Sequence, residues 1–319
     1  MDSNYSIVVI GQLTLDDFVK YDQPPLLDSP GGSGLYALGG VCLWDVDSLG
    51  FVTRRGNDYN LDHVFRQIGK RLDLSGIKEI EAPSIHIWNM FDRKGHRYFI
   101  IQRWGSYDDV MGIYAEDIPD HFKSSQSFLV ASFPFDWQAK VIESLPSGST
   151  ILVDPHFQGV YPPFHDRWNQ LFKKISIFLP SEEELIRFFS VQTQENLRDY
   201  LPMLKDISGR GPEIVGVKVG SRGVVVYDRK IDKAWHVPAF PVKNVVDVTG
   251  CGDAFCGGFL AGYEKSKDTY TAAIYGVVSA SFNTEEFGVV HNFSIDHKRV
   301  GERFDTHKNS LNELEQELN

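Results

Sequence analysis

Short apolar runs alternate with amphipathic segments along most of the chain. Runs rich in β-branched residues predict buried strands, whereas apolar residues repeating about every three or four positions predict helices. Strands are expected over residues 6–10, 48–52, 128–132, 150–154, 176–179, 213–219 and 223–227, and helices over 34–43, 61–75, 136–145, 182–189, 194–205 and 254–263. Strands that alternate with helices in this way favour a mostly parallel sheet covered on both faces.

The pattern differs between residues 84 and 104, where apolar and polar positions alternate around a turn at residues 92–95. This alternation predicts an aromatic-rich β-hairpin. Trp88 and Trp104 are candidates to line a substrate pocket, because an aromatic ring can stack on a sugar or a base; they can equally form the packing face of the hairpin. Arg97 has the same two interpretations, substrate contact or solvated strand charge.

Residues 244–260 contain the strongest candidate for chemistry. Gly250 and Gly252 bracket one small residue, Cys251, and Asp253 follows at the start of the expected helix. Glycines let several N–H groups turn toward one point, and a helix N-terminus adds the positive end of its dipole, so this turn can bind an anion such as phosphate. A carboxylate next to an anion site suggests that Asp253 accepts a proton from a nucleophilic hydroxyl. The alternative interpretation is structural, because aspartate is also a common helix N-cap.

A second candidate site follows the first expected strand. Asp16 comes shortly after residues 6–10, and open α/β sheets bind ligands at the carboxyl ends of their strands. A carboxylate in that position can accept hydrogen bonds from two sugar hydroxyls. A solvated loop aspartate is the alternative interpretation, and Asp17 beside it is the competing candidate.

The pattern Asp-x-Thr-Gly-x-Gly-Asp-x-Phe-x-Gly-Gly over residues 247–258 closely resembles the C-terminal signature of the PfkB (ribokinase-like) carbohydrate kinases. The resemblance implies a ribokinase-like three-layer α/β/α sandwich with a mostly parallel central sheet, in a single kinase domain over residues 1–319. It also implies that Asp253 is the catalytic base and that Gly250, Cys251 and Gly252 form the anion hole. Cys251 stands where the family usually has alanine, and both residues are small.

On the acceptor side, the resemblance covers Asp16 and a Gly-Gly motif at Gly31 and Gly32, which implies binding of the substrate hydroxyls. Tyr36 stands where the family often has asparagine, so the resemblance does not carry the identity of the acceptor. The segment between Asp16 and Gly31 is short, with little room for a full pair of lid strands. We therefore expect a small, reduced β lid contributed mainly by residues 84–104.

On the nucleotide side, residues 217–223 resemble the family's Thr-x-Gly-x-x-Gly turn with lysine in place of threonine, and Asp154 resembles the aspartate of its Asp-x-Asn motif. Glu184 matches the glutamate that organises Mg²⁺ through water in the family; a helix N-cap followed by acidic residues is the alternative for residues 181–184. The implied nucleotide contacts are Lys218, Gly220, Gly223, Thr249, Asn283 and Gly288. ATP and Mg²⁺ are the implied cofactors, and a monovalent cation is left open.

The resemblance therefore implies an ATP-dependent kinase that transfers the γ-phosphate to a hydroxyl of a sugar or sugar-like small molecule. A nucleoside is an alternative acceptor, encouraged by Tyr36 and the aromatic hairpin. A larger glycoside or aminocyclitol is another, because a short lid would leave the cleft open. A different class of function is a catalytically silent PfkB-like binding or regulatory protein. The departures at Tyr36, at Lys218 and at Ser181, which stands where the family has asparagine, leave room for it.

Charge and cysteine content restrict the possible binding partners and the cellular compartment. The 319 residues carry a net charge of −11, which argues against nucleic acid but not against a nucleotide held by local N–H groups and Mg²⁺. Cys42, Cys251 and Cys256 do not make a disulfide framework and favour a reducing compartment. The first residues form neither a basic nor a long apolar segment, so we expect a cytoplasmic protein with no membrane span, as a monomer or homodimer.

Overall fold

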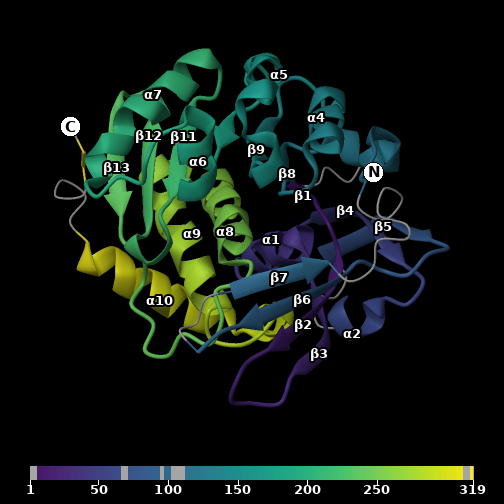
Figure 1. Ribbon diagram of the computed structural model, residues 1–319. Helices are drawn as coiled ribbons and strands as arrows, with labels where there is room; N and C mark the ends of the chain where they lie inside the picture. The colour runs from purple at the N-terminus through teal and green to yellow at the C-terminus, as the bar shows by residue number, and fades with distance from the viewer. Residues whose placement is uncertain (1–5, 66–70, 94–96, 102–111, 312–316, 319) are drawn as a thin grey trace.

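Two β-sheets organise the chain (Figure 1). The computed structural model describes residues 6–65, 71–93, 97–101, 112–311 and 317–318. Within these ranges the larger sheet has nine strands; β12 runs antiparallel to both its neighbours, and the other pairings are parallel. In spatial order the strands are β13 (Lys233–Val237), β12 (Val224–Asp228), β11 (Ile214–Lys218), β10 (Ile177–Phe178), β9 (Thr150–Val153), β8 (Ser127–Val130), β1 (Ile7–Ile10), β4 (Leu49–Gly56) and β5 (Leu72–Ile80).

Helices cover both faces of this sheet, as the sequence predicts. One face packs against α1 (Ser33–Cys42), α8 (Cys251–Ser266), α9 (Thr269–Asn283) and α10 (His297–Ser310), and the other against α4 (Phe135–Ser144), α5 (His165–Leu171), α6 (Glu182–Phe189) and α7 (Leu201–Arg210). In β1, Ile7 and Val9 point into the first core and Val8 and Ile10 into the second, which is why the whole strand is apolar. None of the helices in the described part of the chain is long and apolar enough to cross a membrane.

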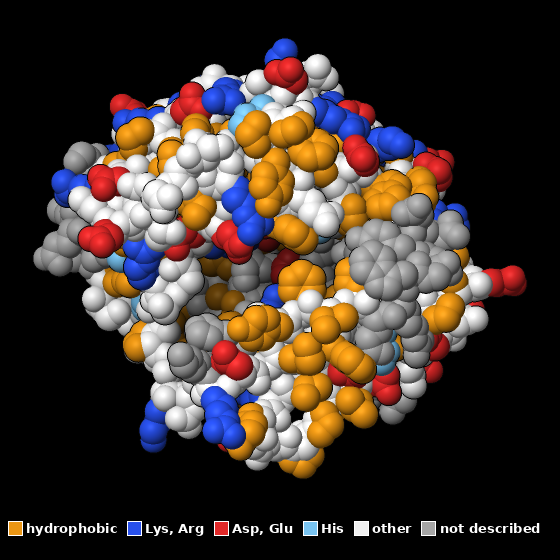
Figure 2. Space-filling model, in the orientation of Figure 1, with side chains coloured by type: hydrophobic (Ala, Val, Ile, Leu, Met, Phe, Trp, Pro, Cys, Tyr) orange, Lys and Arg blue, Asp and Glu red, His pale blue; other side chains and the backbone are white. Residues whose placement is uncertain are grey.

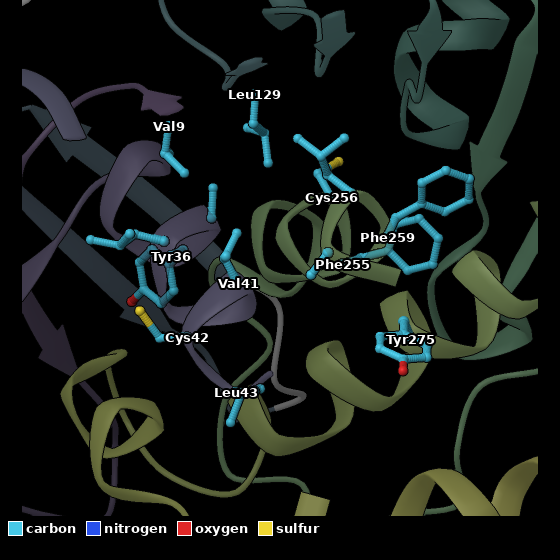
Figure 3. Close-up of a cluster of buried hydrophobic side chains, with 14 of the residues drawn as sticks. Val9, Tyr36, Val41, Cys42, Leu43, Leu129, Phe255, Cys256, Phe259 and Tyr275 are labelled. Atoms are coloured by element: carbon cyan, nitrogen blue, oxygen red, sulfur yellow. The ribbon is translucent and has the colours of Figure 1, made fainter. Parts of the chain in front are cut away.

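Small residues bring α1 and α8 into close contact. A Cβ atom on Gly257 would lie 2.0 Å from the carbonyl oxygen of Ala37, and one on Gly40 would lie 2.1 Å from that of Ala254. Larger side chains at these positions would push the helices apart, because the interior is already close-packed. Figure 3 shows side chains of the sheet, such as Val9, gathered with those of both helices in this core. The packing fixes the N-terminus of α8 next to α1.

The smaller sheet is the lid, and in the described residues its order is β3 (Leu26–Gly31), β2 (Thr14–Val19), β6 (His86–Phe91) and β7 (Arg97–Ile101) (Figure 1). The expected small β lid is confirmed, but residues 84–104 do not contribute most of it, because β2 and β3 supply half of its strands. Asp16 is not a loop residue: it lies inside β2 and pairs with Ser29 of β3, so both strands fit before Gly31. Trp104 lies outside the described residues.

The helix expected over residues 61–75 is confirmed only at its start. Helix α2 spans Leu61–Phe65, and residues from Leu72 onward form β5, which pairs in parallel with β4. Apolar residues spaced four apart suit a helix, but pairing with a buried neighbouring strand overrides that local preference. Strand β13 and helices α9 and α10 have no counterpart among the expected elements.

Candidate active site

The carboxyl ends of three neighbouring strands bring ionisable side chains together. Asp154 directly follows β9, Lys218 is the last residue of β11, and Glu184 lies in the first turn of α6, which begins shortly after β10. Parallel strands end at one edge of a sheet, and open α/β sheets bind ligands at that edge. The nucleotide-side candidates Lys218 and Glu184 therefore share one site with Asp154.

A buried ion pair lies at the centre of this group. Nζ of Lys218 is 2.6 Å from Oδ2 of Asp154, and the Cys256 thiol donates to the same oxygen over 3.4 Å. Burial alone would lower the pKa of Lys218, but the charges of Asp154, Cys256 and Glu184 raise it above its usual range, so the ammonium group stays charged. A Cβ atom on Gly252 would lie 3.4 Å from this Nζ. Lys218 therefore reaches the glycine turn before α8.

Glu184 faces the ion pair from the start of α6. Its Oε2 accepts a hydrogen bond from the N–H of Ser181 at 2.7 Å, and the Ser181 hydroxyl accepts one from the N–H of Glu184 at 3.3 Å. This capping box confirms the N-cap interpretation of the segment. Burial, followed by the charge of Asp154, raises the pKa of Glu184 to about 7. Crowding of buried carboxyl groups in this way suits the binding of a cation.

The turn before α8 has the geometry of an anion site. Gly250 has a φ of 71°, in the left-handed region that favours glycine, and α8 begins at the next residue. Early N–H groups of a helix have no partner within it. The N–H of Cys251 donates to the Val248 carbonyl at 3.3 Å, which leaves the N–H of Gly252 as a candidate donor to an anion; the anion hole itself stays a prediction.

Asp253 lies in this first turn and is coupled to the buried cluster. Burial is the largest cause that raises its pKa well above the usual range; the charges of Asp154 and Glu184 act in the same direction, and Lys218 opposes them. A carboxyl group whose pKa is raised in this way can act as a general base near neutral pH.

Side chains from other elements hold the turn in place. Oδ1 of Asp247 accepts hydrogen bonds from the N–H of Thr249 at 3.1 Å and from its hydroxyl at 3.0 Å, and Nδ2 of Asn283 donates to the Thr249 carbonyl at 2.7 Å. Gly288, with a φ of 71°, lies against Ser29 of the lid. These contacts give Thr249 and Asn283 a role in positioning the turn, and their contact with nucleotide, like that of Gly288, stays a prediction.

Gly220 and Gly223 form the turn between β11 and β12. Their φ angles are 59° and 96°, and a Cβ atom on Gly223 would lie 2.1 Å from the carbonyl oxygen of Val237. Gly220 has no atom of the described residues within 4 Å of its own Cβ position, so its backbone is open to a ligand. Nucleotide binding by this turn stays a prediction.

Asp16 and the Gly-Gly motif meet at the base of the lid. Asp16 is 4% exposed and accepts a hydrogen bond from the Thr14 hydroxyl at 2.8 Å. Burial raises the pKa of Asp16 to about 7. A Cβ atom on Gly31 would lie 2.2 Å from Oδ2 of Asp16, and one on Gly32 would lie 2.3 Å from the carbonyl oxygen of Gln12. Both glycines are therefore required for this close approach.

Tyr36 of α1 joins the acceptor side to the glycine turn. A Cβ atom on Gly250 would lie 2.1 Å from the Tyr36 ring. The pKa of Tyr36 is raised well above its usual range by burial and then by the charges of Asp16, Asp247, Cys251 and Asp253, so its hydroxyl stays neutral. That hydroxyl is buried and has no hydrogen-bond partner among the described residues, which leaves it available to a ligand.

The inner face of the lid carries Arg97, which was a candidate for substrate contact, and Asn89, which was not. Successive strand residues point to opposite faces, so Asp16 shares a face with Asn89 of β6 and Arg97 of β7. Arg97 donates to the Thr249 hydroxyl at 3.0 Å, so this face looks toward the main body. Asn89 is 3% exposed, and its Nδ2 has no hydrogen-bond partner in the described structure. Asn89 could have been found from the sequence, because it is a polar residue at a position that alternation predicts to be apolar.

Trp88 and Asp17 lie on the opposite face of the lid. They are direct neighbours in the pairing of β2 with β6, and the Trp88 indole donates to Oδ2 of Asp17 at 2.9 Å. Of the two adjacent carboxylates, Asp16 is therefore the one that meets Tyr36. The structure does not bring Trp88 to the Asp16 side.

Figure 2 shows a hollow near the centre of the face that it presents, and in Figure 1, in the same orientation, β7 and α8 lie near the centre of the molecule. Residues 119–296 match the model of the pfkB family carbohydrate kinases, which is more than half of the chain and includes the glycine turn and Asp253. This chain belongs to the pfkB family. The family match begins after Asp16 and the lid, so the acceptor side of the site lies outside it.

Individual pfkB-family relatives extend the similarity to most of the chain. A cytidine kinase from Thermococcus kodakarensis is 27% identical over 270 residues, which is 82% of this chain and 89% of that protein. An Arabidopsis thaliana ribokinase complexed with ribose and ATP matches with a TM-score of 0.76 at 20% identity, over 94% of this chain and 99% of that one. A putative ribokinase II from E. coli in complex with ATP and Mg²⁺ matches with a TM-score of 0.75 at 19% identity, over 95% and 100% of the two chains.

These solved structures establish the ribokinase-like fold expected from the sequence. Membership of the pfkB family makes the chain a kinase, a phosphotransferase with an alcohol group as acceptor.

Proposed function

We propose that this pfkB-family kinase transfers the γ-phosphate of ATP to a hydroxyl of a sugar, with Asp253 as the general base. The observation that carries the proposal is the position of Asp253 in the first turn of α8. On the nucleotide side the charges of Asp154 and Lys218 act on the pKa of Asp253, and on the acceptor side the charges of Asp253 and Asp16 both raise the pKa of Tyr36. A base in that position lies between the two substrates whose bond it must help to form.

Each residue around Asp253 has a defined task in this reaction. Asp16 accepts hydrogen bonds from acceptor hydroxyls and thereby orients the acceptor, which replaces a two-body encounter with a positioned one. Asp253 takes the proton of the attacking hydroxyl, a modest demand on its basicity if the transition state is loose. The N–H group of Gly252, together with the Lys218 ammonium group, stabilises negative charge on the transferred phosphoryl group.

The donor set on the nucleotide side fits Mg²⁺. Asp154, Glu184 and Asp253 offer carboxylate oxygens, the ligands that Mg²⁺ prefers, and a single Lys218 does not neutralise all three. Mg²⁺ held here with the ATP phosphates would neutralise charge on the transferred group. A monovalent cation, which the family resemblance left open, stays a prediction.

A nucleoside is the second candidate acceptor. It is supported by the printed name of the cytidine kinase relative and by the unpaired polar groups of Tyr36 and Asn89, which can bind a base as well as a sugar. The larger glycoside or aminocyclitol loses its support, because β2 and β3 complete the lid that was expected to be short. A panel of sugars and nucleosides, each tested for acceptor-dependent ADP release, separates the candidates: phosphorylation of cytidine but not of free sugars would replace the sugar assignment.

Replacing Asp253 tests the mechanism. Asp253→Asn should lower kcat by at least about 100-fold, because the general base is lost, while ATP binding measured by calorimetry stays close to that of the wild type. Asp136→Asn is the matched control, since Asp136 also lies in the first turn of a helix but is 74% exposed. Near-normal turnover by Asp253→Asn would contradict the proposed base.

A further inference from the structure

The lid carries a second cluster of metal-ligating side chains, on the face away from Asp16. We propose that Asp17, Asp28 and His86 form a Zn²⁺ site that ties three lid strands together. The three residues come from β2, β3 and β6, and their ligand atoms all lie within 4.8 Å of one another. This cluster is separate from the carboxylates that face the nucleotide.

The distances in this cluster suit a zinc ion. Nε2 of His86 lies 2.9 Å from Oδ1 of Asp17 and 3.7 Å from Oδ1 of Asp28. Tetrahedral zinc with bonds of about 2.0–2.1 Å sets neighbouring ligand atoms about 3.3 Å apart. The two separations from His86 bracket that value, and the third separation, between the oxygens of Asp17 and Asp28, lies within 4.8 Å, so modest side-chain shifts would place all three atoms around one ion.

His86 supplies the strongest indication. Its side chain is only 9% exposed, and neither ring nitrogen makes a hydrogen bond to any residue that the structure describes. The nearby Asp17 oxygen lies outside hydrogen-bond geometry, so a simple ion pair leaves the imidazole unsatisfied. A buried polar group without a partner is costly, and a metal on Nε2 would remove that cost.

The surrounding contacts orient the Asp17 carboxylate. The Trp88 indole donates to Oδ2 of Asp17 at 2.9 Å, and the N–H of Asp28 donates to Oδ1 of Asp17 at 2.8 Å. Hydrogen bonds of this kind hold metal-binding carboxylates in place. Asp28 has a φ of 53° and a side chain that is 70% exposed, so an ion and its remaining water ligand have access from solvent.

The types of ligand atom favour Zn²⁺ over Mg²⁺. The position of the cluster in the lid links such an ion to the acceptor-binding edge. One imidazole and two carboxylates suit Zn²⁺, whereas Mg²⁺ prefers oxygen ligands alone. Asp16 directly precedes Asp17 in β2, and Gly31, which packs on Asp16, ends β3. An ion that holds β2, β3 and β6 together would therefore steady the acceptor-binding edge of the lid.

Calorimetric titration of the metal-free full chain with Zn²⁺, in the presence of excess Mg²⁺, tests the site. We expect one Zn²⁺ per chain, and Asp28→Asn should weaken its binding at least about tenfold. Asp28 is exposed, so this variant should keep the unfolding temperature of the metal-free wild type. Asp22→Asn, at another exposed lid aspartate, is the control and should bind Zn²⁺ as the wild type does.

His86→Asn provides a second variant, and it too should lose Zn²⁺ binding. Zn²⁺ should raise the unfolding temperature of the wild type and of Asp22→Asn, but not that of Asp28→Asn. Absence of Zn²⁺ binding by the wild type, or equal binding by Asp28→Asn, would overturn the proposal. Neither readout depends on turnover, so either result leaves the assignment of the kinase reaction untouched.

Discussion

Gly250 leaves room for the Tyr36 ring because it has no side chain, and this fixes the position of the turn before α8. Gly250→Ala should place a Cβ atom 2.1 Å from the Tyr36 ring at a φ of 71°. We expect a loss of about 1–3 kcal/mol of stability and a fall in kcat of at least about tenfold, because Asp253 would be displaced with the turn. Thermal unfolding and ADP release measure the two effects.

Gly209→Ala is the control for that substitution. Gly209 lies in α7, and its Cβ position has no neighbour within 4 Å among the described atoms. Alanine is a better helix former than glycine, so this variant should be as stable as the wild type or more stable by up to about 1 kcal/mol. Equal stability and turnover of Gly250→Ala and Gly209→Ala would contradict the tight contact at Tyr36.

The buried Asp16 carboxyl makes the reaction sensitive to mild acid. Because burial raises the pKa of Asp16 to about 7, it is protonated below that pH and loses its ability to accept hydrogen bonds from two hydroxyls. The kcat/KM for the acceptor should therefore fall as the pH drops through about 7, and the raised pKa of Asp253 acts in the same direction. A pH profile that stays flat down to about pH 5, near the range of ordinary carboxyl groups, would contradict a buried, perturbed Asp16.

At the scale of elements, the lid is attached to the segment that leads into α8. Lys20 beyond β2 donates to the Val246 carbonyl at 2.7 Å, and Arg97 of β7 donates to the Thr249 hydroxyl at 3.0 Å. The strand pair that presents Asp16 and the turn that carries Asp253 are thus linked directly. Movement of the lid should change the distance between acceptor and base.

Cutting one of these links tests the coupling. Arg97→Ala should raise the KM for the acceptor about tenfold with little change in unfolding temperature, because a single partly buried hydrogen bond contributes little to stability but holds the lid on the main body. Arg93→Ala is the matched control: Arg93 is also on the lid, but it stacks on Tyr21 at 4.0 Å and leaves the Arg97 link intact. Equal acceptor KM values for the two variants would show that the link does not position the lid.

At the scale of the whole molecule, two sheets each supply half of a reaction site. The large sheet gathers Asp154, Glu184 and Lys218 at the carboxyl ends of its strands, and the lid sheet brings Asp16. When the carboxyl groups of Asp154, Glu184 and Asp253 are ionised, they outnumber the single positive charge of Lys218 in the nucleotide half, which must accommodate a polyanion. We therefore predict that ATP binding depends on Mg²⁺.

Removing Mg²⁺ tests that dependence. ATP should bind at least about tenfold more weakly without Mg²⁺, because the three carboxyl groups then repel its phosphates, and turnover should be lost. Adenosine, which has no phosphates, should bind equally well with and without Mg²⁺. Calorimetry with each ligand measures the difference, and an ATP affinity that is independent of Mg²⁺ would rule out the proposed role of Glu184 and Asp154.

The sequence by itself determined the fold class and located the glycine turn at the start of a helix, because both depend on local patterns; the catalytic role of the turn stays a prediction. The fold class follows from apolar runs and helical periodicity, which reflect which faces of each element are buried. The turn is visible because residues 247–258 combine a left-handed glycine, a helix start and a carboxylate within one short segment. The match of residues 119–296 to the pfkB family supports that interpretation. The place of Asp16 after the first strand also made it a candidate from the sequence, and its contact with the acceptor stays a prediction.

The tertiary structure alone decided what depends on pairing between distant segments. Whether Asp16 or Asp17 faces the site is fixed by the register of β2 with β6, since one residue of shift exchanges the two faces of a strand. The same register puts Asn89 with Asp16 and moves Trp88 to the other face. Lys218 meets Asp154, 64 residues away, only because parallel strands end at a common edge. Such contacts leave no signal in either local segment, which is why the acceptor half was the less predictable part of this protein.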